Sequence, residues 1–129
     1  GAPITALRQW SWHAAGVERS GRQLQQALRD CEQLREQLRL DRALAPILQL
    51  EPGQSFSLSS SQEQQLGWLW ECRQRLQTTV LLLDAAHFRQ ESRGGHFRCD
   101  APATLPYWQH HTLQQRDQPI RSSAGLDNR

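Results

Sequence analysis

Hydrophobic residues recur every three or four positions along two long stretches of this chain. In the first, between about Glu18 and Leu40, they form one stripe consisting of Leu24, Ala27, Leu28, Cys31, Leu34 and Leu38. This spacing is typical of a helix that buries one face, and charged residues such as Glu32 and Arg35 occupy the opposite face. The pattern therefore predicts an amphipathic helix from about Glu18 to Leu40.

The second stretch begins after a run of serines and ends at Gly94-Gly95. Its apolar spacing extends over three heptads, with a seam formed by Leu66, Leu69, Arg73, Leu76, Val80, Leu83 and His87, which Trp70 and Cys72 widen. Ser60 followed by Glu63 predicts a capping box at the start, and the two glycines predict the end. Such a seam indicates a helix packed along others in a bundle.

Two shorter helices complete the expected fold. One spans about Ile4 to Ala15 and stops at Gly16, and the other spans about Asp41 to Leu50, where Pro46 should kink or restart it. Short turns between successive helices make neighbours antiparallel. We therefore predict an all-α fold, a three-helix up-down bundle of spectrin-like type with a short N-terminal helical segment, and we find no strand pattern.

The region after the last helix has no helical period, and its prolines exclude a long helix. Residues 94–113 contain Phe97, Leu105, Tyr107 and Trp108, which disordered segments rarely carry. We expect this part to be an extended, irregular arm that lies against a surface. From Gln114 to Arg129 the composition becomes polar. The predicted organisation is thus a bundle with a docking arm over residues 1–113 and a flexible tail over residues 114–129.

Composition narrows the class of protein. The 129 residues fit one domain, and the formal net charge of +2 argues against a nucleic-acid or membrane partner. All the basic residues other than histidine are arginine. Three widely spaced cysteines fit reduced thiols better than disulfides or a zinc finger, and no apolar run approaches the length of a membrane span. With no signal peptide visible, a cytoplasmic location is expected.

The densest chemistry lies at the end of the last helix and just beyond it. The candidate site residues there are Glu91, Ser92, Arg93, Gly94, Gly95, His96, Arg98, Asp100, Trp108 and His111. His87 and Glu91 are four apart, as in a metal site, but no second helical pair supplies further ligands. The chain also has no nucleophile elbow and only one RGG triplet. We therefore assign no catalytic residue, metal ligand or cofactor-binding residue within this chain.

These residues carry a family resemblance. Residues 89–102, Arg89-Gln90-Glu91-Ser92-Arg93-Gly94-Gly95-His96-Phe97-Arg98-Cys99-Asp100-Ala101-Pro102, resemble the R-x-E-S-R-G-x-H-x-R-x-D-x-P run of the succinate dehydrogenase, fumarate reductase and L-aspartate oxidase flavoproteins. Trp108 with His111-Thr112 resembles the W-x-x-H-T that follows this run. Upstream, Leu7-Arg8-Gln9-Trp10 and Ala15-Gly16-Val17-Glu18-Arg19 resemble the segment that opens the second helix of the same C-terminal domain. The similarity covers about residues 4–113.

The L-aspartate oxidase branch fits best, because Arg98-Cys99-Asp100 and Ala103-Thr104-Leu105 stand where the succinate enzymes carry R-E-D and R-D-D runs. The resemblance implies the C-terminal helical domain of an enzyme that uses FAD to oxidise L-aspartate to iminoaspartate. Quinolinate synthase uses that product on the route to NAD, so it is a further candidate partner. This chain has no GxGxxG motif, so it should bind no FAD and be inactive alone.

The resemblance further implies that the partners are the FAD-binding and capping domains of the same enzyme. Arg93, His96, Arg98 and Asp100 would hold the domain onto them through charge-assisted hydrogen bonds, with Gly94-Gly95 capping the helix. The alternative is a network within the domain that ties the arm to the bundle, and both can hold together. Two other interpretations of the chain stay open: a succinate dehydrogenase or fumarate reductase domain, and a free-standing helical adaptor.

Overall fold

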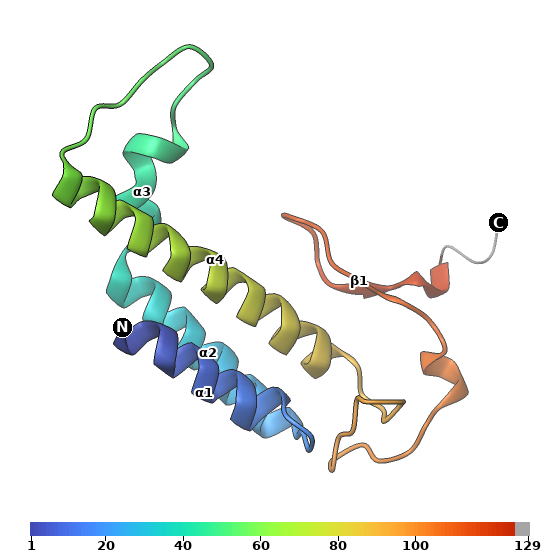
Figure 1. The fold of residues 1–129 in the computed structure, drawn as a ribbon. Helices are drawn as coiled ribbons and strands as arrows, with labels where there is room; N and C mark the ends of the chain where they lie inside the picture. Colours follow the sequence, from blue (N-terminus) through green and yellow to red (C-terminus); the bar gives the residue numbers. More distant parts are fainter. Residues whose placement is uncertain (126–129) are drawn as a thin grey trace.

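The computed structural model describes residues 1–125, and the fold is mostly helical with one small sheet (Figure 1). The four α-helices are α1 (Ala2–Ala15), α2 (Gly21–Leu38), α3 (Leu40–Leu48) and α4 (Ser60–Phe88). The elements after α4 are short: η1 (Pro106–Trp108), β1 (Thr112–Leu113), β2 (Arg121–Ser122) and η2 (Ser123–Gly125). The predicted helical class is confirmed in this form, whereas the strand pair was not predicted.

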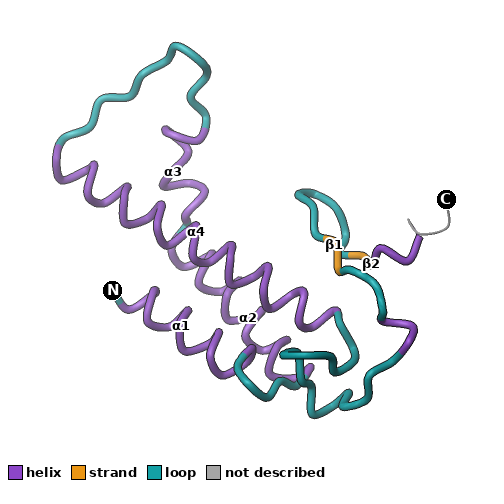
Figure 2. Tube along the Cα trace, turned by 45° about the vertical axis from the view of Figure 1, so that its right-hand side comes forward, coloured by secondary structure: helices purple, strands orange, loops and turns teal. Residues whose placement is uncertain are grey.

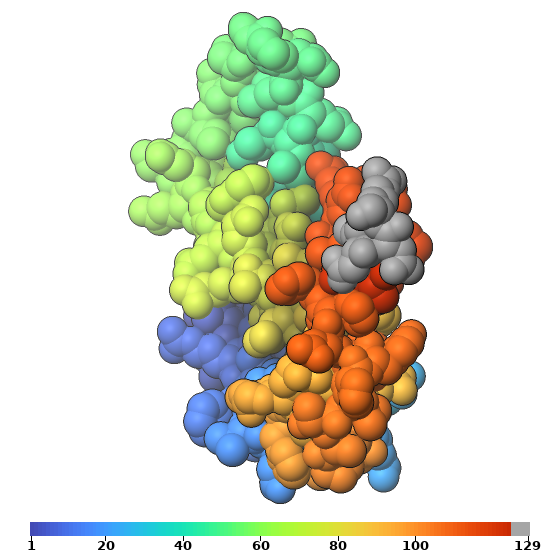
Figure 3. Space-filling model, turned by 90° about the vertical axis from the view of Figure 1, so that its right-hand side faces the viewer, coloured from blue at the N-terminus to red at the C-terminus, as the bar shows by residue number. Residues whose placement is uncertain are grey.

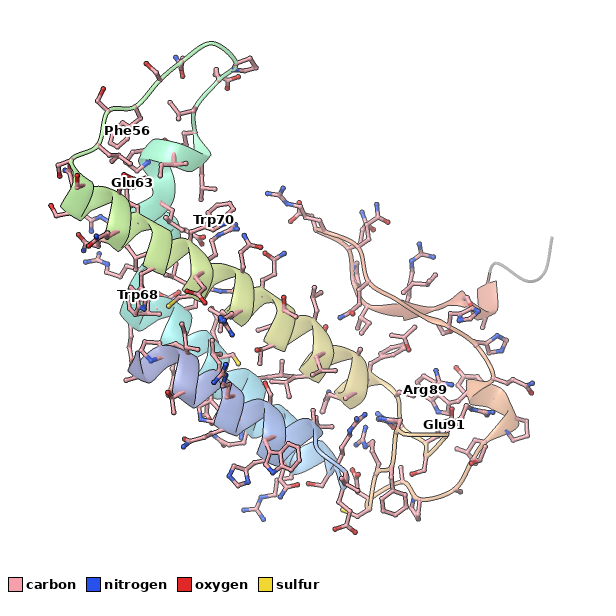
Figure 4. The ribbon with its side chains drawn as sticks, in the orientation of Figure 1. Phe56, Glu63, Trp68, Trp70, Arg89 and Glu91 are labelled. Atoms are coloured by element: carbon pink, nitrogen blue, oxygen red, sulfur yellow. The ribbon has the colours of Figure 1, made fainter. Side chains whose placement is uncertain are left out.

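The core lies where α1, α2 and α4 meet, since each of these helices contacts the other two. The predicted stripe of α2 is confirmed, with Leu24 and Cys31 fully buried. The seam of α4 is also confirmed at Leu69, Cys72, Leu76 and Leu83, all of which are buried. Trp70 does not widen the seam, because it is 42% exposed and projects to a different side of α4 from Trp68 (Figure 4).

The break after α2 falls at Arg39 instead of at Pro46. Ser20 caps the start of α2, its Oγ accepting the Gln23 N–H at 3.3 Å. At the end, Arg39 takes a left-handed conformation (φ 48°) from which its N–H still reaches the carbonyls of Arg35 and Glu36. Pro46 lies inside α3, where its missing N–H removes one backbone hydrogen bond, and the helix ends two residues later.

Both predicted ends of α4 are wrong. The capping box is one residue earlier than expected: Ser59 Oγ accepts the Gln62 N–H at 3.3 Å, and Gln62 Oε1 accepts the Ser59 N–H at 3.0 Å. The helix ends at Phe88, because Arg89 adopts extended backbone and starts the arm. Gly94 and Gly95 therefore do not cap α4. They lie in a tight turn that requires a positive φ of 57° at Gly94.

The arm, defined here as residues 89–111, folds around the end of α4 and returns to the loop between α1 and α2 (Figure 2). The return is a short backbone pairing, in which the Arg19 N–H donates to the Phe97 carbonyl at 3.0 Å and the Cys99 N–H donates to the Arg19 carbonyl at 2.8 Å. The arm contains no long helix, as predicted.

A hairpin follows the arm, with β1 and β2 antiparallel and Thr112 opposite Ser122. Gln114 Nε2 donates to the carbonyl of Leu81 on α4 at 3.1 Å, which fastens the hairpin to the bundle. Strands of two residues are too short to show alternation in a sequence. Residues 126–129 of the predicted tail lie outside the described residues, and the mobility of the rest stays a prediction. Among residues 1–125, no helix is long and apolar enough to cross a membrane.

Candidate interdomain docking site

Glu91 is a fully buried carboxylate at the centre of the arm, just beyond the end of α4 (Figure 4). Arg89 donates to its Oε1 from Nε at 2.9 Å and from Nη2 at 2.6 Å. Arg93 donates from Nε to Oε1 at 2.9 Å and from Nη2 to Oε2 at 3.2 Å. The Leu105 N–H adds a bond to Oε2 at 2.9 Å. One buried anion is thus shared between two arginines.

These contacts keep Glu91 ionised. The hydrogen bond from Arg93 lowers the pKa of Glu91 to about 2, helped by the Leu105 N–H and by Arg89, although burial acts in the opposite direction. The same pairing raises the pKa of Arg93. Glu91 is therefore ionised at neutral pH, where it pairs with the two arginines.

Arg98 is buried as well, and it completes the end of α4. Its Nη1 donates to the carbonyls of His87 at 2.7 Å, Arg89 at 3.3 Å and Ala86 at 3.4 Å. The last carbonyls of a helix have no partner within the helix, and a cation there complements the negative end of the helix dipole. Arg98 thus acts as a C-terminal cap for α4, supplied from the arm.

The same guanidinium reaches a second helix through Asp100. Arg98 donates from Nε to Asp100 Oδ1 at 3.0 Å and from Nη2 to Oδ2 at 2.7 Å, a two-point contact. Asp100 Oδ2 then accepts the N–H of Gly21, the first residue of α2, at 3.0 Å. The Arg98 hydrogen bond and the Gly21 N–H lower the pKa of Asp100 to about 2. The pair therefore joins the end of α4 to the start of α2, with each charge at the helix end that favours it.

Gly21 leaves room for this pair. A Cβ at position 21 would lie 2.5 Å from Arg98 Nη2 and 2.8 Å from Asp100 Oδ2, so Gly21→Ala must displace both groups. We expect a loss of about 1–3 kcal/mol in the free energy of unfolding despite the better helix propensity of alanine. Chemical denaturation measures it, and Gly67→Ala on the open face of α4 is the control. A stabilised Gly21→Ala variant would contradict the bridge.

Ser92 and Thr104 fix the turn of the arm between these charged pairs. Ser92 Oγ accepts the Arg98 N–H at 2.9 Å and donates to the Ala101 carbonyl at 2.9 Å. Thr104 Oγ1 donates to the Ser92 carbonyl at 2.6 Å. Among residues 1–125 no buried side-chain polar atom is without a hydrogen-bond partner. The arm is thus held by specific polar contacts and forms a defined structure in this chain by itself.

His96 links the arm to the loop between α1 and α2. Its Nδ1 lies 2.7 Å from Arg19 Nη1, and its Nε2 lies 3.0 Å from the Arg89 carbonyl. Because arginine can only donate, Nδ1 must accept, and Nε2 then carries the proton toward the carbonyl. This assigns the neutral ring. Burial, together with the positive charges of Arg19, Arg98 and Arg89, lowers the pKa of His96, although the Arg89 carbonyl opposes the shift.

Stability should fall in mild acid through His96. Its pKa is lower in the fold than the ordinary value of 6.5, so the unfolded chain binds more protons as the pH falls below that value. The contribution is complete above pH 6.5 and is lost as the pH falls through the folded pKa. Melting temperatures across this range measure the effect. His96→Gln keeps an acceptor for Arg19 and should flatten the dependence of the melting temperature on pH. The control, His13→Gln on the exposed face of α1, should leave that dependence unchanged. An unchanged slope in His96→Gln would contradict the neutral assignment.

The family-model comparison identifies what kind of domain carries this cluster. Residues 52–124 match the model of the fumarate reductase flavoprotein C-terminal domain. This chain belongs to that family. The match covers more than half of the chain and includes all of α4, the arm and the hairpin.

Two curated flavoenzymes are similar to this family member over most of its length. An L-aspartate oxidase of Synechocystis sp. is 38% identical over 108 residues, and an L-aspartate oxidase of Nostoc sp. is 37% identical over 112 residues. Each alignment covers 83% of this chain but only about a fifth of the relative, 20% and 19% respectively. No solved structure matches it. The chain is thus similar to a C-terminal part of L-aspartate oxidase-like flavoproteins, as its motifs suggested.

The ten predicted docking residues of this flavoprotein domain make different kinds of contact in the structure. Glu91, Ser92, His96, Arg98 and Asp100 all have their polar atoms engaged within the domain, which is the network given as the alternative above. Trp108 joins through Arg89, which stacks on its ring and donates to its carbonyl, and through an edge contact with Phe88. His111 takes part through its backbone, which is paired with Ser123. Whether any of the ten touches another domain stays a prediction.

Sequence analysis missed four contributors to the cluster: Arg19, Gly21, Arg89 and Thr104. Arg19 and Arg89 stood inside the motifs that resemble the family, so the signal for them was present. Gly21 carried none, because its role depends on which side chains surround it. His87 contributes its carbonyl to Arg98, and no group of three or more possible metal ligands occurs within residues 1–125.

The cysteines play no part in this cluster. Cys31 and Cys72 are buried in the core as free thiols, and burial raises the pKa of Cys31 to about 11 and also raises the pKa of Cys72. Cys99 is an exposed free thiol on the arm. The three are not joined to one another in the described structure, and their reduced state stays a prediction.

Proposed function

We propose that this chain is the C-terminal helical domain of an FAD-dependent L-aspartate oxidase, in which it has a structural and docking role. The observation that carries the proposal is the 38% identity to the Synechocystis enzyme over 83% of the chain. The full enzyme would oxidise L-aspartate to iminoaspartate for NAD synthesis through quinolinate, in the cytoplasm. Its partners would be the FAD-binding and capping domains, with quinolinate synthase as a further candidate.

The contacts described above support a scaffold role. The charge cluster at the end of the bundle is built from capping and bridging interactions, and no polar atom of Glu91 or Arg98 is left over for a substrate. We infer that flavin and substrate bind elsewhere in the full enzyme and that this chain is inactive alone. In the same proposal α1, α2 and α4 form an up-down, spectrin-like bundle that serves as the rigid base of the arm.

The test uses the complete gene product alongside the 129-residue chain. L-aspartate added without oxygen should bleach the bound flavin of the complete protein, whereas the 129-residue chain should purify colourless. Reduction of the flavin by succinate instead of L-aspartate would select the succinate enzyme branch. A complete gene product that holds no flavin would select the free-standing adaptor.

A further inference from the structure

The charge cluster contains more positive than negative groups. Its cations are Arg19, Arg89, Arg93 and Arg98, and its anions are Glu91 and Asp100, so two positive charges are in excess. Arg98 and Asp100 form a matched pair, whereas Arg89 and Arg93 share the single carboxylate of Glu91. A partly buried excess charge is costly unless an anion faces it. One excess charge therefore lies at Arg89 and Arg93, and the other lies at Arg19, whose side chain contacts the neutral His96.

Arg93 is the member of this pair that faces outward. Its side chain is 36% exposed, against 17% for Arg89. Its Nε and Nη2 bind Glu91, and Nη2 also donates to the Leu105 carbonyl at 3.1 Å, but its Nη1 has no partner among residues 1–125. The Nη1 edge of the Arg93 guanidinium is thus open, whereas its other nitrogen atoms are held by hydrogen bonds.

Arg93 lines a hollow of about 520 Å³ between the arm and the hairpin, together with Arg89, Gln109, His110 and His111 among others. The arm and the hairpin form one continuous face along the side of α4, drawn orange to red in Figure 3. Tyr107 is 74% exposed and Leu105 is 40% exposed on the same arm. Exposed aromatic and aliphatic side chains next to an arginine are typical of a protein interface.

We propose that this hollow, with Arg93 as its contact residue, binds an aspartate or glutamate side chain of the flavin-binding portion of the same enzyme. The inference rests on the proposed function, and it assigns the docking role to one residue of the ten predicted. Arginine pairs with carboxylates through two parallel donors, and a partner carboxylate would neutralise the excess charge. The relatives are about five times longer than the part of them that this chain matches, so a large neighbouring portion is available.

The absence of lysine from the chain permits a direct test in the complete gene product. Arg93→Lys places the only side-chain amine of residues 1–129 at the hollow. A zero-length carbodiimide reagent then joins that amine to any carboxylate in contact with it, and mass spectrometry identifies the partner. The control is Arg116→Lys at the hairpin turn, where the native side chain is 92% exposed. A bond from position 93 to an acidic residue outside residues 1–129, without one from position 116, supports the proposal. A bond to Glu91 alone, or none, overturns it.

A second measurement does not depend on the cross-link. A protease site inserted before residue 1 releases the domain from the complete protein, and the affinity of the two pieces can then be measured. Arg93→Gln should weaken the affinity between the two pieces about tenfold, because a hydrogen bond between charged groups contributes at least this much. Arg116→Gln should leave the affinity unchanged. An unchanged affinity in Arg93→Gln overturns the proposal. If L-aspartate fails to reduce the flavin but the cross-link forms, the docking site stands and the proposed reaction falls.

Discussion

Replacing Glu91 by glutamine is expected to destabilise this domain by about 3–5 kcal/mol, the cost typical of breaking a buried ion pair. Glutamine has nearly the same shape, so packing is retained. It cannot accept from Arg89, Arg93 and the Leu105 N–H as a carboxylate does, and its amide would face the two guanidinium groups. Two arginines would then share a cavity with no anion. Chemical denaturation of the 129-residue chain measures the loss.

The pH dependence provides a second readout of the same group. The pKa of Glu91 is lowered from 4.5 to about 2, so its stabilising effect is complete above pH 4.5 and is lost as the pH falls toward 2. Glu91→Gln should remove this part of the acid dependence. The control is Glu71→Gln on α4, whose carboxylate pairs with Arg75 at an exposed i,i+4 position and should contribute about 0.5 kcal/mol. Equal losses in the two variants would contradict a buried, shared anion.

The sequence predicted the parts of this fold that depend on periodicity. The stripes of α2 and α4 could be assigned because burial of one helix face imposes a spacing of three and four residues. Pro102 and Pro106 likewise excluded a helix in the arm. These features are local, since each residue's role follows from its neighbours along the chain.

The helix ends could not be predicted in the same way. The sequence of α4 could have continued to Gly94, yet the helix stops at Phe88. It stops there because Arg98, ten residues later, takes the carbonyls that another helical turn would have used, and because Arg89 turns toward Glu91. Arg39 provides the opposite case, since nothing in its side chain marks it as the residue that takes a left-handed conformation.

The sequence predicted which residues belong to the candidate site, but it could not predict how their side chains are arranged. Composition placed Glu91, Arg93, Arg98 and Asp100 together, because charge, glycine and aromatic residues are concentrated there. It could not show that Arg98 is buried against two helix ends while Arg93 keeps an open edge. The contact between Arg19 and His96 spans 77 positions, and only the return of the arm to the loop between α1 and α2 reveals it.

Substituting Arg98 by methionine is expected to cost about 2–3 kcal/mol, because it removes the cap of α4 and the partner of Asp100 at once. Arg98→Lys keeps the charge but loses the planar fork that serves two helices simultaneously, so its loss should be smaller but clearly measurable. Hydrogen exchange at the last turn of α4 and the first turn of α2 should accelerate in both variants, since the bridge joins these two ends. The control is Arg75→Met, whose native side chain is exposed on α4 and should matter little. If exchange rises at only one of the two helix ends, Arg98 caps a single helix, and the arm does not couple α4 to α2.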